Sequence, residues 1–316
     1  MSGDPQAAQA LRQGRRAAIE KGRLNIEMQV ESVLEQLYFT TARLEAFGPN
    51  GGSVGTGFLY GVKASGPALP GRGGDVHVLV TNKHVLEGAT RLRVTMVRRS
   101  EGNQPVLGEA WQATIEDVTS ALWTGHPDPE IDVAVLPFTI VLNVMQEQTG
   151  TVPYFVAITP DIALTPARAT ELDAVEEVLF IGYPRGLFDS VNLLPVARRG
   201  TTASPIAVDY EGKPQFMIDA SVFPGSSGSP VFIANVGGYG DRRGNFNVAT
   251  RVIFLGIIAS SHVYRDIAEV LPLPTEGKQA AVVEAFLNLG MVFKAAALDQ
   301  TVDVFLEANG HQRVVA

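Results

Sequence analysis

The sequence of 316 residues is 46% hydrophobic and 18% charged, and it contains 32 glycines and 19 prolines. This composition is typical of a soluble globular protein with one large or two modest domains. The net charge of −8 argues against general nucleic-acid binding, and the absence of cysteine excludes disulfides and a thiol nucleophile.

Residues 1–37 are predicted to form an N-terminal helical arm. Apolar residues from Pro5 to about Gln36 recur near helical spacing, although Gly14 and Gly22 weaken a continuous helix. Basic residues dominate the first part of the arm and glutamates its later turns, so it is a candidate for self-association, for docking a protein partner or for contact with an anionic surface. The alternative is a helix that simply packs on the body of the protein.

The sequence shows no signal for export or for a membrane. Its first residues lack the apolar segment of a secretory signal, and no run reaches the roughly 18 apolar residues of a membrane-spanning helix. We therefore expect no membrane span and a cytoplasmic location.

Short β-branched runs and frequent turn residues favour an all-β architecture for the rest of the chain. A loop rich in glycine and proline is expected over residues 61–75, before a strand-like run that ends at a histidine. A linker within residues 143–160 separates two strand-rich halves. In the second half we expect a loop over residues 237–247 and a C-terminal helix over residues 298–309, whose apolar residues fall on one helical face.

A serine, a histidine and an aspartate in these runs form a candidate hydrolytic site. Ser227 lies in a glycine-bounded turn between two apolar runs. A serine hydroxyl is a poor nucleophile unless a base removes its proton. His84, at the end of its strand-like run, is the candidate base, and Asp132 is the candidate carboxylate that orients the base.

Each assignment has a competitor. A Gly-Ser-Ser-Gly-Ser segment is often only a flexible loop, and Ser226 or Ser229 is an alternative to Ser227. Asp128 is an alternative carboxylate in a segment rich in turn formers. Asp132 is favoured because it alone directly precedes the apolar run. The remaining histidines show no metal-ligand spacing, so no metal and no cofactor are expected.

Several short motifs follow one another along the chain. They are Gly55-Thr56-Gly57-Phe58, Thr81-Asn82-Lys83-His84-Val85, Ile131-Asp132-Val133-Ala134-Val135-Leu136, Ile181-Gly182-Tyr183-Pro184-Arg185-Gly186, Ile218-Asp219-Ala220, Pro224-Gly225-Ser226-Ser227-Gly228-Ser229-Pro230 and Leu289-Gly290-Met291-Val292-Phe293. In this order they resemble the motifs of the trypsin-like (chymotrypsin-fold) serine peptidases, and most closely those of their bacterial HtrA-type branch. The resemblance covers roughly residues 38–309, and the order His, Asp, Ser differs from that of the subtilisins and α/β-hydrolases.

This resemblance implies a mainly β fold of two packed six-stranded β-barrels, over residues 38–150 and 151–316, with the arm before them and a closing C-terminal helix. It implies a hydrolase, a serine endopeptidase that cleaves polypeptides through an acyl-enzyme on Ser227, with His84 and Asp132 completing a catalytic triad. The backbone N–H groups of Gly225 and Ser227 would form the oxyanion hole. Few residues follow the C-terminal helix, so the PDZ module that commonly follows the HtrA-type protease is expected to be absent.

The resemblance also suggests the substrate-binding residues. Ser221 lies near the floor of the specificity pocket, and Ala259, Ser260 and Ser261 form the wall that pairs with an extended substrate. None of them is acidic, so we expect a small or medium apolar residue at the cleaved position and not Lys or Arg.

Two alternatives from other classes stay open. The family usually has a glycine at the position of Ser229, and a misaligned turn there would leave a catalytically silent trypsin-fold interaction module. The second alternative is a latent effector protease that is activated when a partner binds the N-terminal arm.

Overall fold

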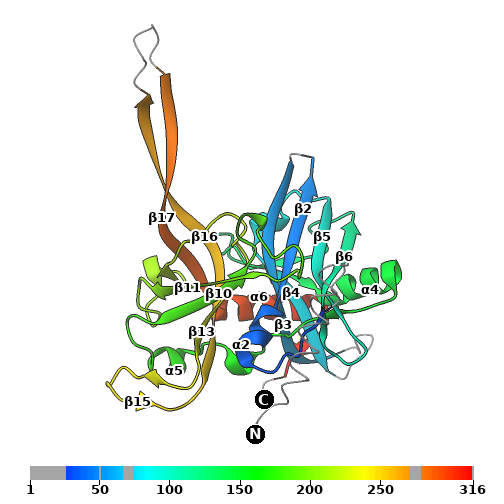
Figure 1. Cartoon of the computed structure of the whole chain (residues 1–316), viewed down its shortest axis with the longest axis horizontal. Helices are drawn as coiled ribbons and strands as arrows, with labels where there is room; N and C mark the ends of the chain where they lie inside the picture. Colours follow the sequence, from blue (N-terminus) through cyan, green and yellow to red (C-terminus); the bar gives the residue numbers. More distant parts are fainter. Residues whose placement is uncertain (1–25, 50, 67–73, 271–278, 315–316) are drawn as a thin grey trace, which may run out of the picture.

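The computed structural model describes residues 26–49, 51–66, 74–270 and 279–314. The chain folds into two β units that lie side by side, with helices around them (Figure 1). None of the helices in the described ranges is long and apolar enough to cross a membrane.

The first unit is a ten-stranded sheet. The strand order is β1-β6-β5-β2-β3-β4-β8-β7, while β9 joins β5 and β18 joins β3. Alternate residues of β2 are buried, as expected for a sheet with one face on a core. The strands are β1 (Ile26–Glu27), β2 (Thr41–Gly48), β3 (Gly51–Ser65), β4 (Asp75–Thr81), β5 (Arg91–Arg99), β6 (Pro105–Glu116), β7 (Thr124–Gly125), β8 (Ala134–Pro137), β9 (Pro153–Tyr154) and β18 (Gln312–Arg313).

The second unit is a closed six-stranded barrel with the strand order β10-β11-β12-β17-β16-β13. The predicted mainly β, chymotrypsin-like fold class is thereby confirmed, together with its C-terminal helix α6 (Ala295–Ala308). The strands are β10 (Glu177–Gly182), β11 (Val196–Thr202), β12 (Gln215–Asp219), β13 (Pro230–Asn235), β16 (Arg251–Val270) and β17 (Gln279–Lys294).

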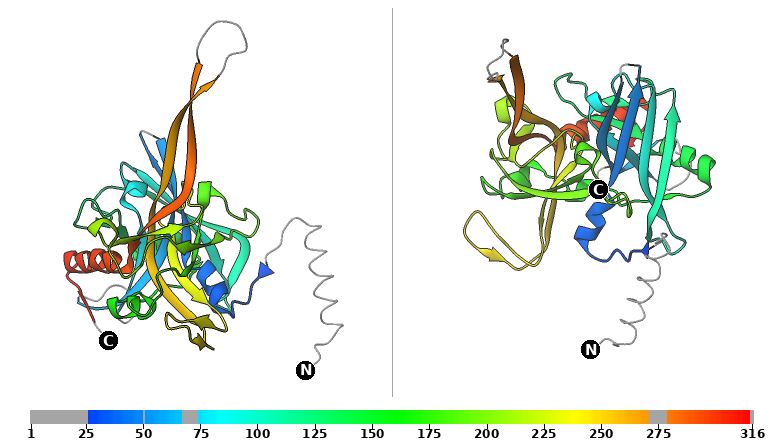
Figure 2. Two further views of the ribbon diagram at one scale, coloured as in Figure 1. Left: turned by 90° about the vertical axis from the view of Figure 1, so that its left-hand side faces the viewer. Right: turned by 45° about the horizontal axis from the view of Figure 1, so that its top comes forward.

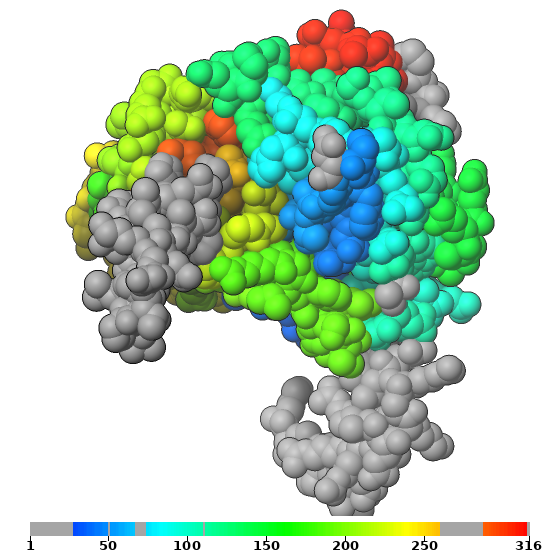
Figure 3. All heavy atoms as spheres, turned by 90° about the horizontal axis from the view of Figure 1, so that it is seen from above, coloured from blue at the N-terminus to red at the C-terminus, as the bar shows by residue number. Residues whose placement is uncertain are grey.

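An aromatic cluster joins the two units. Phe58 of β3 packs edge-on against Phe254 of β16 with ring centroids 5.5 Å apart, and Phe232 of β13 lies 5.7 Å from Phe254. All three rings are fully buried, and burying one such side chain stabilises a fold by about 1.5–3 kcal/mol. Helix α6 contacts β7 and β8 of the sheet as well as β16 and β17 of the barrel, and it forms the red group at one edge of the body in Figure 3.

The helices outside the motifs differ in part from the expectation. The predicted arm lies mostly before residue 26, outside the described residues. In its described part, Ile26–Glu27 pairs with β6, and helix α2 (Val33–Tyr38) begins only after Ser32, whose side chain and that of Glu35 form a capping box. A helix through residues 26–32 is therefore wrong.

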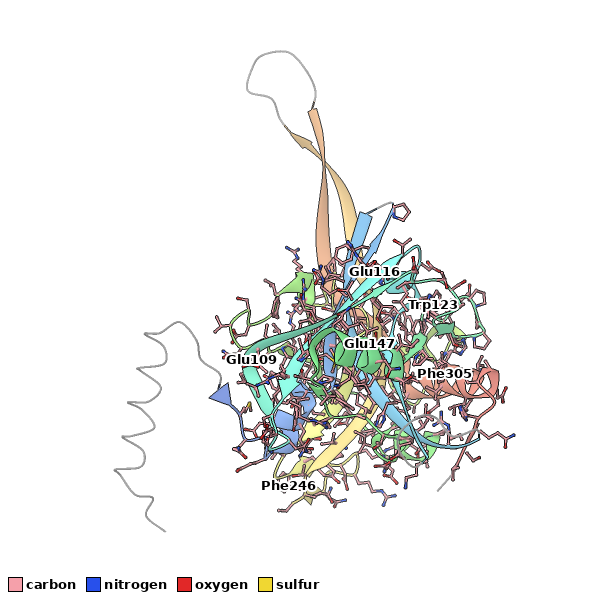
Figure 4. The ribbon with its side chains drawn as sticks, turned by 90° about the vertical axis from the view of Figure 1, so that its right-hand side faces the viewer. Glu109, Glu116, Trp123, Glu147, Phe246 and Phe305 are labelled. Atoms are coloured by element: carbon pink, nitrogen blue, oxygen red, sulfur yellow. The ribbon has the colours of Figure 1, made fainter. Side chains whose placement is uncertain are left out.

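The expected linker also contains a helix, α4 (Phe138–Thr149), which contacts β6 and β4. It buries Phe138, Val141 and Met145 against the first sheet and ends at Gly150, which has φ +68°. Glu147 on its outer side is labelled in Figure 4, as are Glu109 and Glu116 of the neighbouring β6.

Two predicted loops are partly strand. Strand β3 continues to Ser65, so only the end of the 61–75 loop remains, of which residues 67–73 lie outside the described part. Residues 237–247 contain a small hairpin of β14 (Tyr239–Gly240) and β15 (Phe246–Asn247). Phe246 is 73% exposed and points away from the body (Figure 4). The remaining short helices are α3 (Lys83–Leu86), α5 (Pro166–Ala169), η1 (Pro160–Ile162), η2 (Pro184–Gly186) and η3 (Tyr210–Gly212).

Candidate active site

The structure places His84 and Asp132 in direct contact. Strand β4 ends at Thr81, and the single turn of α3 that follows carries His84. The Nδ1 atom of His84 lies 2.5 Å from Oδ2 of Asp132, and the backbone N–H of His84 donates to Oδ1 of the same carboxylate at 3.1 Å. One carboxylate thus fixes both the imidazole ring and the backbone that carries it.

Asp132 is itself held by Asn82, the residue between β4 and α3. The side-chain amide of the fully buried Asn82 donates to the backbone carbonyl of Asp132 at 2.5 Å. The competing Asp128 stabilises the turn in which it lies. Its carboxylate accepts the N–H of Glu130 at 2.9 Å, and its backbone carbonyl accepts a hydrogen bond from the ammonium group of Lys83. Asp132 is therefore the aspartate that contacts His84.

Ser227 lies in a turn between β12 and β13 that only glycine permits at two positions. Gly225 has φ +89° and Gly228 has φ +87°. A Cβ atom on Gly225 would lie 2.6 Å from the carbonyl oxygen of Tyr183, and one on Gly228 would lie 1.9 Å from that of Thr56. At both positions the backbone is left-handed and a neighbouring carbonyl oxygen lies where a Cβ atom would be. Only glycine tolerates both conditions.

Thr56 of β3 fastens the Ser227 turn to the first sheet. Its backbone N–H donates to the carbonyl of Ser227 at 2.9 Å, and its hydroxyl donates to the carbonyl of Gly225 at 3.0 Å. The same hydroxyl accepts the N–H of Tyr183 at 3.0 Å. Thr81, three positions before His84, donates to the carbonyl of Thr56 at 2.8 Å. A chain of hydrogen bonds therefore connects the histidine strand to the serine turn.

The peptide before Gly225 has a defined orientation. The N–H of Arg185 donates to the carbonyl of Pro224 at 2.5 Å. A trans peptide directs its C=O and N–H to opposite sides, so the N–H of Gly225 points away from Arg185. Within the described ranges, the N–H groups of Gly225 and Ser227 have no acceptor. Unpaired backbone N–H groups in one turn can donate to a negatively charged oxygen.

The hydroxyl of Ser227 is bonded to the barrel. It donates to the carbonyl of Ala259 in β16 at 3.3 Å. Among the residues that the structure describes, no hydrogen bond joins Ser227 to His84. Ser260 and Ser261 follow Ala259 in the same strand, opposite Met291 and Gly290 of β17, and the half-buried Ser221 lies between β12 and the serine turn.

Ser229 is accommodated without loss of the turn. Its N–H donates to the carbonyl of Ser226 at 3.0 Å, and its carbonyl accepts the N–H of Ile258 at 2.9 Å. A Cβ atom on Gly182 would lie 2.0 Å from Oγ of Ser229, so Gly182 provides the space for this hydroxyl. The hydroxyls of Ser226 and Ser229 are buried and have no partner in the described part of the chain.

A cavity of about 260 Å³ lies beside His84. The end of β2, the start of β3, helix α3 and the residues after it line the cavity, including Phe47, Ser53 and Val85. Across the described ranges, no cluster of three or more His, Asp or Glu residues is suited to a metal ion.

Sequence reasoning missed three positioning groups: Thr56, Asn82 and the backbone N–H of Arg185. All three stand inside the motifs quoted above, so the signal was present. Their roles depend on hydrogen bonds to residues 50 to 169 positions away or, for Arg185, to the serine turn, and a motif does not specify such partners.

The two β units have the fold of a serine endopeptidase. A family model for the trypsin-like peptidase domain matches residues 55–237, more than half of the chain. The chain belongs to the trypsin-like peptidase family.

Solved structures with a similar arrangement have low sequence identity. A serine endoprotease from Yersinia pestis is 16% identical, with a TM-score of 0.44, over 89% of this chain and 70% of that one. The thermostable serine protease AL20 from an extremophilic microorganism is 17% identical, with a TM-score of 0.42, over 84% and 95%. The tobacco etch virus protease in complex with product is 12% identical, with a TM-score of 0.45, over 92% and 86%. No curated protein matches the chain.

Proposed function

We propose that this endopeptidase works through a Ser227–His84–Asp132 triad and a covalent acyl-enzyme. The observation that carries the proposal is the 2.5 Å contact between His84 Nδ1 and Asp132. Hydrogen bonds through Thr81 and Thr56 connect this pair to a serine turn with two unpaired N–H groups. An anchored imidazole and a donor pair for an oxyanion are the two elements that acyl transfer to serine requires.

The role of His84 follows from which of its imidazole nitrogens is hydrogen-bonded to Asp132. Asp132 accepts the proton on Nδ1, so Nε2 of His84 is the basic nitrogen. It takes the proton of Ser227 as Oγ attacks the carbonyl carbon of the substrate, and the N–H groups of Gly225 and Ser227 bind the resulting oxyanion. The imidazolium then protonates the departing amine. Water, activated by the same nitrogen, hydrolyses the ester and frees Ser227.

The hydrogen bond from Ser227 to Ala259 favours a second, related function. Ser227 must leave the Ala259 carbonyl before its hydroxyl can donate to His84, so the described state of the nucleophile is a resting one. This supports the latent effector protease, in which a bound partner shifts the equilibrium toward the active rotamer. The N-terminal arm as its docking element and the cytoplasmic location stay predictions.

Substrate preference belongs to the same proposal. Ser221 and the wall of Ala259, Ser260 and Ser261 contribute no charged side chain, so we propose a small or medium apolar residue at the cleaved position. Profiling with a peptide library that varies only this residue tests the assignment, and a strong preference for Lys or Arg would contradict it.

Labelling with a fluorophosphonate, followed by intact mass, tests the nucleophile. We expect one adduct on the wild type and on Ser226→Ala, whose hydroxyl is buried beside the site, and none on Ser227→Ala or His84→Ala. Digestion of the unfolded protein β-casein by the same samples tests peptide-bond cleavage. Absence of both label and cleavage in the wild type would indicate the silent module, and their appearance only with a partner would indicate the latent enzyme.

A further inference from the structure

Strands β16 and β17 extend beyond the barrel as a two-stranded hairpin that projects from the molecule (Figures 1 and 2). Inside the barrel, β16 lies between β13 and β17. Pairing with β13 ends at Pro230 opposite Ile257, and Ile258 then bonds to Gly228 and Ser229. Beyond this point β16 continues to Val270, where it pairs with Gln279 of β17.

The backbone of β16 therefore has a long unpaired edge. From Ala259 to Val270, no strand within the described ranges pairs with the side of β16 opposite β17. Such an edge presents a row of N–H and C=O groups that can take up another strand, and an isolated two-stranded hairpin is only marginally stable in water. An added strand would satisfy these groups and stabilise the hairpin.

This edge begins at the candidate nucleophile. The carbonyl of Ala259 accepts the Ser227 hydroxyl at 3.3 Å, and the following residues of β16 lead away from the site toward the hairpin tip. A polypeptide attacked at Ser227 that lies along this edge would have its scissile bond at Ala259 and its other residues beside the hairpin.

The position of His84 determines which part of the substrate lies along the edge of β16, the part before the scissile bond or the part after it. The departing amine must take its proton from His84, which lies in α3 of the first unit, so the part of the substrate after the scissile bond lies toward that unit. The part before the scissile bond, which stays on Ser227 as the acyl group, lies toward the barrel. It would run from the hairpin tip toward Ala259 and so be antiparallel to β16.

We propose that the edge of β16 beyond the wall of Ala259, Ser260 and Ser261, as far as about Ile267, is an exosite. It binds the segment of an unfolded polypeptide that lies further before the scissile bond, as an added antiparallel strand over roughly 20 Å. This inference rests on the proposed function and names its substrate class. Register shifts between Ile258 and Ser260 and between Ser261 and Val263 mark bulges at the barrel end of the hairpin, whereas β16 pairs regularly with β17 from Val263 to Val270.

The first test compares substrates of different length. A site mapped in β-casein supplies two peptides, one with about four residues before the cleaved bond and one with about ten. We expect kcat/KM for the longer peptide to be about tenfold or more higher. A variant with residues 263–286 replaced by Asn-Gly should lose this advantage, while its fluorophosphonate labelling and its kcat/KM for the short peptide stay unchanged.

The second test needs no change in the protein. Single N-methyl groups are placed along the longer peptide beyond the fourth residue before the cleaved bond. Strand pairing predicts losses at alternate residues only, because every second N–H points to the same neighbour. Because the scan uses the wild-type protein, it tests strand pairing even if the shortened variant fails to fold.

Equal kcat/KM for both peptides, or an even response to N-methylation, would overturn the exosite while leaving the proposed function intact. Failure of labelling and of all cleavage would instead overturn the proposed function. Sedimentation analysis tests whether a second copy of the chain occupies the edge instead. A wild-type dimer that becomes monomeric in the shortened variant would assign the edge to self-association and overturn the exosite.

Discussion

The hydroxyl of Thr56 in β3 donates a 3.0 Å hydrogen bond to the carbonyl of Gly225, 169 positions later in the chain. Because the same hydroxyl accepts the N–H of Tyr183, one buried side chain satisfies two backbone groups of the barrel from the neighbouring sheet. The position of the serine turn relative to His84 depends on this bridge.

Replacing Thr56 with valine keeps the shape of the side chain and removes the bridge. It leaves the Gly225 carbonyl and the Tyr183 N–H unpaired, and each unpaired buried group costs about 1–3 kcal/mol. We expect a lower free energy of unfolding and a kcat reduced by roughly tenfold or more, with a smaller effect on KM. Denaturant unfolding and steady-state kinetics measure both. Thr56→Ser retains the hydroxyl and should stay close to the wild type; equal losses in both variants would argue against the bridge.

Asp132→Asn should lower kcat by roughly 10³–10⁴, the order found when a triad aspartate is replaced, because the amide can stabilise the wrong imidazole tautomer. The control is Asp128→Asn, whose carboxylate binds the N–H of Glu130 and not His84. We expect the control to keep its activity. If Asp128→Asn were the inactive variant, the assignment of Asp132 would be wrong.

Gly228→Ala should prevent formation of the serine turn. The new methyl group would meet the Thr56 carbonyl at 1.9 Å in addition to the strain of φ +87°. A substitution at Gly244 separates the steric clash from the backbone strain, because Gly244 has φ +81° but no atom lies within 4 Å of an added Cβ. Gly244→Ala should cost only about 1–2 kcal/mol, whereas Gly228→Ala should cost clearly more or fail to fold. Thermal unfolding compares the two variants, and similar losses in their unfolding temperatures would contradict the steric argument.

The buried hydroxyl of Ser229 has no partner among the described residues. Ser229→Ala removes this unpaired group and leaves the backbone turn intact, so we expect it to be neutral or to stabilise the fold by about 1 kcal/mol, with activity retained. Loss of activity in Ser229→Ala would show that the hydroxyl has a catalytic task. Chemical denaturation and peptide hydrolysis give the two readouts.

The loop after η2 contains a carboxyl whose pKa is lowered. The side chain of Asn192 donates to the Asp189 carboxylate at 2.7 Å, and the N–H groups of Val191 and Asn192 donate at 3.0 Å. The Asn192 side chain is the largest cause that holds the pKa of Asp189 below its ordinary 3.8. The contribution of Asp189 to stability is therefore present above pH 3.8 and is lost as the pH falls through the lowered value.

Asn192→Ala should raise the pKa of Asp189 toward 3.8, so that this contribution is lost at a higher pH. Carbon NMR of the carboxyl group follows the titration directly. Asn245→Ala is the control, because it removes the matching bond to Asp241 at the β14–β15 hairpin and should leave Asp189 unchanged. An unshifted Asp189 in Asn192→Ala would contradict the assigned cause.

The local chemistry of the site was predictable from sequence. The glycines around Ser227, the polar end of the run before His84 and the aspartate directly before an apolar run each depend on neighbours within a few residues, which a motif records. The same holds for the mainly β architecture and for α6, whose buried face repeats at helical spacing.

Only the tertiary structure decided which distant groups meet. The Thr56 bridge, the Asn82 bond to Asp132 and the Ser227 bond to Ala259 each join residues at least 32 positions apart. Helix α4 likewise occupies the first part of the expected linker, because Phe138, Val141 and Met145 are buried against the first sheet. Side-chain pattern determines which face of an element is apolar, but the register and packing of distant strands determine which backbone groups are paired and which, like the edge of β16, remain open.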